Sequence, residues 1–333
     1  MTAALWRRPV RKTFALGVIA LALGFGGPVE AREILIVAHL YSEASIQHQG
    51  LLEANQELLA GSNGGIGLEI KPNGLLGDQD SRLLDSVIFG RSDIAIIGAS
   101  AAARDFASLS VLSAPFVFRD YMHWSHFKDS TLARDLIGGY DASGGGTIVL
   151  GFYYSGFRHV ISRMPVRGIG DLTGLRIRVP SVPIYFQFFQ ALGAVPTPWP
   201  FSTINDGFDG GRFDAVEKTL ATIDDEKFYE RAPNITLTGH MLDTALFLVN
   251  AARLAALPAR QRDLVRAVFT RLSERLSERI RQRELDSRTM LEQRGVTFFP
   301  VDRDALAARI APLASSTNYA WSGALYGKIH AIP

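Results

Sequence analysis

Apolar residues alternate along the chain between two spacings. Short β-branched runs are typical of buried strands, and segments with the helical spacing of three to four residues separate them. This alternation predicts an α/β fold built on a largely parallel sheet and divided into two lobes. The segments that carry the pattern are, in order, residues 33–40, 42–59, 66–71, 80–89, 93–97, 147–153, 175–179, 184–192 and 214–216.

The longest periodic segment lies near the C-terminus. From Pro258 to Arg294 apolar residues recur every four positions, and Gly295 ends the pattern. We expect one helix here, long enough to lie across both lobes. Four arginines between Arg271 and Arg283 repeat at the same interval. Because glutamates are interleaved with them, we interpret the row as a solvated helix face and not as a phosphate site.

The first 31 residues differ from the rest of the chain. A basic head that includes Arg7 and Arg8 precedes an apolar run over residues 13–27, and small residues follow at Val29 and Ala31. This arrangement predicts a secretory signal peptide, and therefore a periplasmic protein. The apolar run is shorter than the about twenty residues that a membrane-spanning helix needs. An uncleaved anchor and twin-arginine export remain alternatives to ordinary secretion.

Charge and composition exclude several classes of protein. The full chain has 35 lysines and arginines against 33 aspartates and glutamates, and the predicted leader carries much of the basic excess. The mature protein is therefore nearly neutral, which gives no argument for a nucleic-acid partner. The chain has no cysteine, so a disulfide framework, a thiolate zinc site and a cysteine nucleophile are all excluded.

Motifs of common enzymes are missing from the sequence. It contains no G-x-S-x-G, no H-E-x-x-H and no P-loop. His123 and His126 have a spacing that places two imidazoles on one helix face, but no acidic third ligand completes a metal motif. We therefore predict no catalytic residue, no metal site and no cofactor.

Two arginines lie in otherwise apolar strand-like segments. Arg158 follows S-G-F, and Arg178 lies near the end of the run L-R-I-R-V-P at residues 175–180. A buried guanidinium is costly unless it meets an anion, and its planar donors match a carboxylate in a bidentate geometry. The residues alone leave two alternatives open: the anion is a bound ligand, or it is an internal aspartate or glutamate.

Several ordered motifs resemble those of the solute-binding proteins of tripartite ATP-independent periplasmic (TRAP) transporters. The main one is D-L-T-G-L-R-I-R-V-P at residues 171–180, and the others lie on both sides of it over nearly the whole mature chain. They are N-G-L-L-G-D at 73–78, A-P-F-V-F-R-D at 114–120, A-L-G-A at 191–194, P-T-P at 196–198, F-D-A-V-E at 213–217, K-F-Y-E at 227–230 and L-T-G-H at 237–240.

This resemblance implies a two-lobed periplasmic binding protein fold, with a ligand cleft between the lobes and a long helix spanning both. The implied lobes are residues 32–155 with about 243–283, and residues 156–242 with about 284–333. The implied function is to bind a small organic acid and deliver it to the small and large permease subunits in the membrane. We expect a monomer or a dimer.

Two other functions remain as alternatives. One is a sensory ligand-binding protein that acts on a receptor. The other, ranked last, is a periplasmic enzyme with Glu217 as general base. A carboxylate beside arginines stays ionised, and it is then a poor base near neutral pH.

The resemblance also implies the residues that contact the ligand. Arg178 is expected to clamp a ligand carboxylate, and Arg158 to add a second cationic contact. The further residues implied at the cleft are His39, Ser100, Phe201, Glu217 and Lys218, with Tyr153, Tyr154 and Trp199 as aromatic candidates that are equally consistent with core packing.

The chain departs from the family pattern at two places that bear on the ligand. Residues 214–219 read D-A-V-E-K-T, so that Lys218 replaces a frequent amide, and residues 98–101 lack the charged pair of sialic-acid binders. We therefore expect a small dicarboxylate, keto acid or sugar acid instead of sialic acid. Lys218 would pair with a second carboxylate or a hydroxyl of the ligand, or it would only neutralise Glu217.

Overall fold

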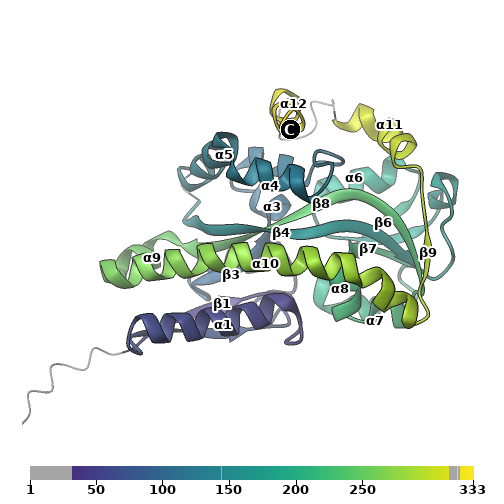
Figure 1. The fold of residues 1–333 in the computed structure, drawn as a ribbon. Coiled ribbons are helices and arrows are strands. Elements are labelled where there is room, and N and C mark those ends of the chain that lie inside the picture. The colour runs from purple at the N-terminus through teal and green to yellow at the C-terminus, as the bar shows by residue number, and fades with distance from the viewer. Residues whose placement is uncertain (1–31, 144, 315–320, 322) are drawn as a thin grey trace, which may run out of the picture. The chain divides into compact units, whose positions relative to one another are not determined.

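The computed structural model describes residues 32–143, 145–314, 321 and 323–333, and a single nine-stranded sheet runs through them (Figure 1). The strand order is β2-β1-β3-β8-β4-β7-β5-β6, and β9 pairs with β8 outside this path. The predicted leader lies outside the described residues. The strands are β1 (Glu33–Ala38), β2 (Ile66–Lys71), β3 (Ile94–Gly98), β4 (Thr147–Ser162), β5 (Arg176–Val179), β6 (Val195–Pro198), β7 (Ala215–Thr219), β8 (Asn234–Asn250) and β9 (Thr297–Phe299).

The two ends of the sheet are parallel, but its centre is not. β1 pairs in parallel with β2 and β3, and β5 pairs in parallel with β6 and β7. Between these ends, β4 and β8 form a long antiparallel ladder. The prediction of a largely parallel sheet is therefore wrong for the centre, because β4 and β8 run in opposite directions. The flanking strands, in contrast, are joined by strand–helix–strand crossovers.

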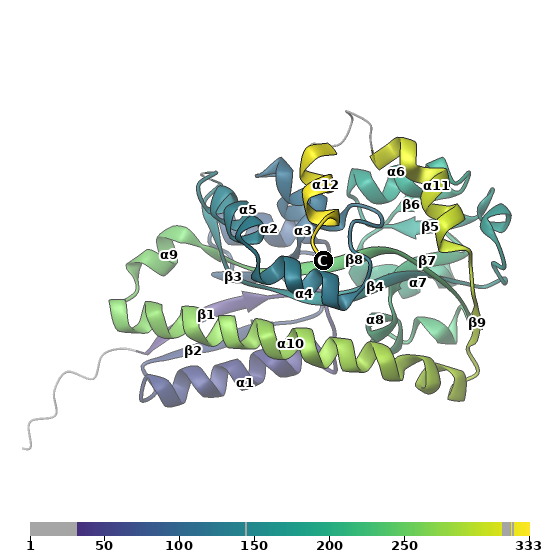
Figure 2. The same ribbon diagram turned by 45° about the horizontal axis from the view of Figure 1, so that its top comes forward.

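Helices cover both faces of the sheet (Figures 1 and 2). α10 crosses β4 and also contacts α1 and α8, while α3 and α5 lie on the opposite face (Figure 1). No helix in the described part of the chain is long and apolar enough to cross a membrane. The helices are α1 (Ile46–Gly61), α2 (Asp80–Ile88), α3 (Ala99–Ala102), α4 (Tyr121–Asp129), α5 (Thr131–Asp141), α6 (Pro183–Ala191), α7 (Ile204–Asp209), α8 (Leu220–Asp225), α9 (Ala251–Ala256), α10 (Ala259–Gln293), α11 (Arg303–Ala314) and α12 (Gly323–His330).

α10 is the long helix that the sequence predicts. Val268, Leu272, Leu276 and Ile280, which follow the four-residue spacing, are all fully buried. Gly295 has φ +85°, in the left-handed region that favours glycine just past a helix end. This prediction is confirmed, including the position of the stop.

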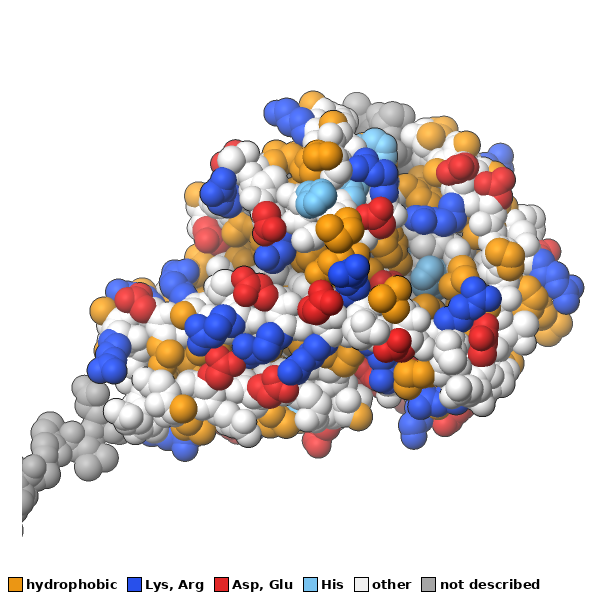
Figure 3. Space-filling view, in the orientation of Figure 1, with side chains coloured by type: hydrophobic (Ala, Val, Ile, Leu, Met, Phe, Trp, Pro, Cys, Tyr) orange, Lys and Arg blue, Asp and Glu red, His pale blue; other side chains and the backbone are white. Residues whose placement is uncertain are grey.

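The arginine row on α10 is exposed or half-exposed, and it is paired with carboxylates of neighbouring helices. Arg271 and Arg279 form ion pairs with Glu57 and Glu53 of α1 at 2.9 and 2.8 Å, and the last arginine of the row reaches Asp224 of α8. Figure 3 shows these alternating basic and acidic side chains along α10 and α1. The exposure of these arginines agrees with the interpretation as a solvated helix face, and their partners belong to the neighbouring helices.

The fold has two lobes that share the central ladder. The first contains β1–β3 with α1 and α2, and the second contains β5–β7 with α6–α8 (Figure 1). The ladder has a β-bulge between Tyr154 and Gly156, and Gly156, which pairs with Asp243, has φ +102°. The boundaries predicted at residues 155/156 and 242/243 coincide with this bulge, and they stay a prediction.

The histidine pair on α4 contacts the end of the chain. His123 Nδ1 accepts the N–H of Arg119 at 3.1 Å, and its Nε2 lies 2.9 Å from the carbonyl oxygen of Ile329. His126 Nδ1 lies 2.8 Å from the carbonyl oxygen of Pro333. The described residues contain no group of three or more histidine, cysteine, aspartate or glutamate side chains that could hold a metal ion.

Candidate ligand-binding site

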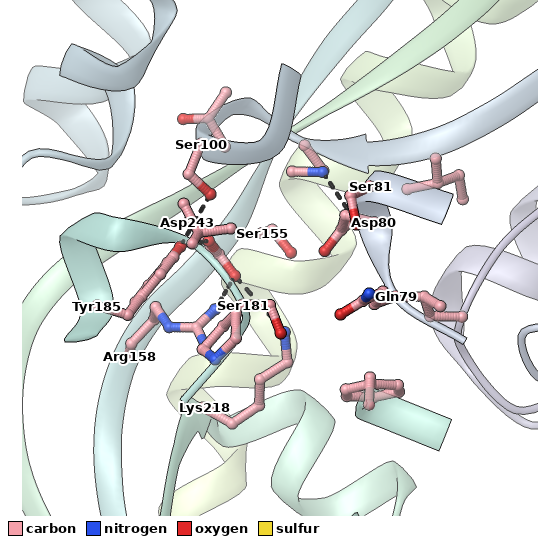
Figure 4. Close-up of a pocket in the computed structure, with 18 of the residues that line it drawn as sticks. Gln79, Asp80, Ser81, Ser100, Ser155, Arg158, Ser181, Tyr185, Lys218 and Asp243 are labelled. Atoms are coloured by element: carbon pink, nitrogen blue, oxygen red, sulfur yellow. Dashed lines mark hydrogen bonds and ion pairs between the residues drawn. The ribbon is translucent and has the colours of Figure 1, made fainter. Parts of the chain in front are cut away.

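A cavity of about 50 Å³ lies between the two lobes at the bulge of the central ladder. The first lobe contributes polar side chains from the start of α2 and from α3, including Asp80 and Ser100. The ladder contributes Arg158 and Asp243 (Figure 4). The second lobe adds Arg178 with others. The cavity therefore brings cations and carboxylates together from segments that are far apart in the sequence.

Strand geometry explains why Arg178 is buried at this place. Arg176 and Arg178 are two residues apart on β5, so their side chains leave the same face of the sheet. Arg176 lies at the strand end, is about half exposed and pairs with Asp214. Arg178 lies further in and is only 3% exposed.

Arg158 is enclosed by two internal carboxylates. Its Nε and Nη2 donate to the carboxylate of Glu217. Its Nη1 donates to Asp243 (Figure 4). Its guanidinium carbon also lies 4.7 Å from the centre of the Tyr185 ring. The second alternative from the sequence therefore holds for Arg158, because its anion is internal.

Glu217 is fully buried behind Arg158 and does not line the cavity. Burial raises the pKa of this carboxyl, but the charge of Arg158 and the contact with His240 outweigh burial and hold the pKa at about 2. His240 Nε2 lies 3.5 Å from Glu217 Oε2, and its Nδ1 shares a 2.8 Å hydrogen bond with the Thr238 hydroxyl. Glu217 is thus ionised near neutral pH and is occupied by its partners.

Arg178 has a different set of partners. Its Nε and Nη2 both donate to the carbonyl oxygen of Trp199, at 2.9 and 2.7 Å. Burial lowers the pKa of Arg178 to about 10, so it stays cationic near neutral pH. Among the described residues no carboxylate lies within ion-pair distance of its guanidinium. The edge of the guanidinium formed by Nε and Nη2 is fixed by the neutral Trp199 carbonyl. These two bonds do not use the opposite end of the guanidinium, which carries Nη1.

Lys218 lies beside the Arg158 network. Its Nζ is 3.6 Å from Asp243 Oδ2 and 5.3 Å from the centre of the Phe201 ring. Burial and Arg158 lower the pKa of Lys218, and Asp243 acts in the opposite direction. The carboxylate paired with Lys218 in this structure is therefore Asp243.

Residues 37–319 match the family described as bacterial extracellular solute-binding protein, family 7. The chain belongs to this family. It is 30% identical over 255 residues to the 2,3-diketo-L-gulonate-binding periplasmic protein YiaO of Escherichia coli K12, with 76% of each chain covered. As a member of a binding-protein family, it is not an enzyme.

Solved structures of TRAP periplasmic solute-binding proteins have the same fold as this family 7 protein. One from Xanthobacter autotrophicus with bound β-D-galacturonate has a TM-score of 0.84 and 24% identity, covering 90% of this chain and 100% of that one. One from Actinobacillus succinogenes with bound L-galactonate has a TM-score of 0.83 and 25% identity, covering 89% and 98%. The two-lobed fold with its long spanning helix is thereby confirmed.

The remaining residues predicted for the cleft of this family 7 protein fall into two groups. Ser100 and Phe201 line the cavity together with Arg158, Arg178 and Lys218. The others lie outside it: His39 shares a 3.1 Å hydrogen bond with His48, Tyr154 donates its hydroxyl to Glu284, Tyr153 is buried in the core, and Trp199 donates its indole N–H to the carbonyl oxygen of Thr203.

Two acidic residues of the cavity were not predicted from the sequence. Asp243 interrupts an apolar run in β8, so the argument that singled out Arg158 also applies to it. Asp80 is the first residue of α2, where an aspartate is usually a surface residue that favours the helix start. Its sequence context therefore carries no signal for a cavity.

Proposed function

We propose that this family 7 protein captures a small organic acid anion at Arg178 and delivers it to the membrane subunits of a TRAP transporter. The observation that carries the proposal is a buried guanidinium on the cavity wall with no internal carboxylate partner among the described residues. A buried charge is costly unless it is paired, and a ligand carboxylate supplies the missing anion.

The geometry of Arg178 favours a carboxylate in particular. The Trp199 carbonyl takes the edge formed by Nε and Nη2 and holds the guanidinium plane in one orientation. A carboxylate at the opposite end would accept from Nη1 and from the second hydrogen of Nη2, which is a bidentate arrangement. The similar proteins named above bind acids, 2,3-diketo-L-gulonate, galacturonate and galactonate, and this supports the same class of ligand here.

Delivery requires that the protein has two states. Contacts across the cavity support a closed state: the N–H of Phe201 donates to the carbonyl oxygen of Asp78 at 3.1 Å, and the N–H of Ser42 donates to Glu226 at 3.0 Å. These bonds join the lobes, and opening at the bulge of the ladder would break them. We infer that the permease subunits recognise the surface that closure creates.

A thermal-shift screen with paired variants tests the binding step. Carboxylates, sugar acids and the matching neutral sugars are added to the wild type, to Arg178→Met and to Arg176→Met. Arg176 is the control because it has the same side chain on the same strand but is exposed outside the cavity. An acid at 100 times its Kd is expected to raise the Tm of the wild type and of Arg176→Met by about 5 °C. The same acid is expected to leave the Tm of Arg178→Met unchanged.

Stabilisation by neutral sugars, or an acid effect that survives in Arg178→Met, would contradict the clamp. Uptake of the stabilising acid by cells tests the delivery step. Deleting the gene should abolish uptake, the wild-type gene should restore it, and the Arg178→Met gene should not. Unchanged uptake in the deletion strain would favour the sensory alternative over transport.

A further inference from the structure

The charges of the cavity are not those of a site for two anionic groups. Arg158 is neutralised by Glu217 and Asp243, and Lys218 shares Asp243 with it. Only Arg178 lacks an internal carboxylate within ion-pair distance among the described residues. A ligand that places one carboxylate on Arg178 therefore finds no second unneutralised cation.

The Asp80 carboxylate, which belongs to the first lobe, lies in the same cavity as Arg158, Arg178 and Lys218. Asp80 Oδ1 accepts the N–H of Gly98 at 3.1 Å, and no hydrogen bond from a described side chain reaches its other oxygen. Figure 4 shows Asp80 entering the cavity from α2, on the side of Ser155 and Asp243. Burial raises the pKa of Asp80, and Asp243 acts in the same direction, while Gly98, Lys218 and Arg158 lower it.

From this arrangement we infer that Asp80 is a specificity residue that restricts the ligand to acids with a single carboxylate and hydroxyl groups at the other end. The inference rests on the proposed acid-binding function. A ligand hydroxyl can donate to the available oxygen of Asp80, whereas a second carboxylate cannot donate and is repelled by Asp80 and Asp243. Asp80 thus acts mainly by excluding ligands that have a second carboxylate. This replaces the expectation that Lys218 pairs with a second carboxylate of the ligand.

A matched pair of six-carbon acids tests the inference. D-Galactonate and galactarate have the same carbon chain, but galactarate has a second carboxylate where galactonate has a terminal hydroxymethyl group. D-Gluconate and D-glucarate form a second such pair. Isothermal titration at pH 7.5 measures the Kd of each acid for the wild type, Asp80→Asn and Asp78→Asn. Asp78 is the control because it is acidic and close in sequence, but it pairs with Arg82 outside this cavity.

The wild type and Asp78→Asn are expected to bind the aldonate at least 100-fold tighter than its aldarate. In Asp80→Asn the ratio should fall below tenfold, mainly because the aldarate binds more tightly. If Asp80→Asn does not fold, Asp80→Ser removes the same charge with a smaller side chain and is expected to give the same change.

Four results separate the inference from the function on which it rests. A wild type that binds both acids of a pair equally, or a ratio that stays unchanged in the folded Asp80 variants, would overturn the inference alone, provided that binding still requires Arg178. If no acid binds, or if binding survives in Arg178→Met, the proposed function fails and the inference fails with it.

Discussion

The two buried arginines of the site have different partners. Arg158 and Arg178 are 2% and 3% exposed, and both belong to the same sheet. Arg158 binds two internal carboxylates, whereas Arg178 binds one neutral backbone carbonyl. A buried guanidinium therefore indicates that an anion is needed, and only its surroundings tell whether the protein or a ligand provides that anion.

Substituting each arginine by methionine tests this difference most directly. Arg158→Met leaves Glu217 and Asp243 buried without their main counter-charge, and it should lower the free energy of unfolding by about 3–5 kcal/mol. Arg178→Met leaves only a backbone carbonyl without its donors, and it should cost about 1–3 kcal/mol at most. Urea unfolding without ligand measures both values. Equal losses in the two variants would remove the distinction between them.

The pH dependence of stability tests the ion pair between Arg158 and Glu217. Because the pKa of Glu217 is held at about 2, below its ordinary value of 4.5, its ion pair stabilises the fold fully above about pH 4.5 and less as the pH falls toward 2. The full effect is about 3 kcal/mol. Urea unfolding of the wild type and of Glu217→Gln from pH 7 to pH 3 should therefore give a difference that shrinks with acid. A difference independent of pH would mean that the charge of Glu217 contributes nothing.

Tyr154 and Tyr153 test the difference between a bonded and an unbonded buried group for neutral hydroxyls. Tyr154→Phe removes the hydroxyl bonded to Glu284 and should cost about 1–2 kcal/mol of unfolding free energy. Tyr153→Phe is the control, because the buried Tyr153 hydroxyl has no hydrogen-bond partner among the described residues, and it should be neutral or stabilising. Neither hydroxyl lies in the cavity, so ligand affinity should change less than twofold in both variants. A large loss of affinity in Tyr154→Phe would restore the predicted ligand contact.

The exposed arginines of α10 should give the smallest effect. Arg271 pairs with Glu57 on α1, but both side chains are partly in solvent. Arg271→Ala should lower the free energy of unfolding by less than about 1 kcal/mol, and 1 M salt should remove most of the difference. A loss as large as that of Arg158→Met would show that ion pairing at this surface is not governed by burial.

The sequence predicts most of the fold because most elements bury one face or follow a clear crossover pattern. The segments at residues 66–71 and 80–89 and the stop at Gly295 agree with β2, α2 and the end of α10. β8 was not predicted as a strand. The reason is that β8 is buried on both faces over nearly its whole length, so no solvent-facing polar side marks it as a strand.

The site is less predictable than the fold. The cost of a buried charge identifies Arg158 and Arg178 in the sequence, but it does not identify their partners. Glu217 and Asp243 come from β7 and β8, and only the register of these strands against β4 brings them to Arg158. The place of Asp80 likewise depends on how α2 packs against β3, which no local pattern encodes.

The ladder of β4 and β8 also determines the order in which the chain can fold. It is an antiparallel pair in which Ser162 pairs with Asn234, and β5, β6 and β7 lie between its two strands in the sequence. Pairing between segments so distant in sequence forms slowly, and it requires that the chain through Asn250 is already present. A chain truncated before β8 would leave the edges of β3 and β4 unpaired, and such edges favour aggregation. We therefore expect that neither lobe folds on its own.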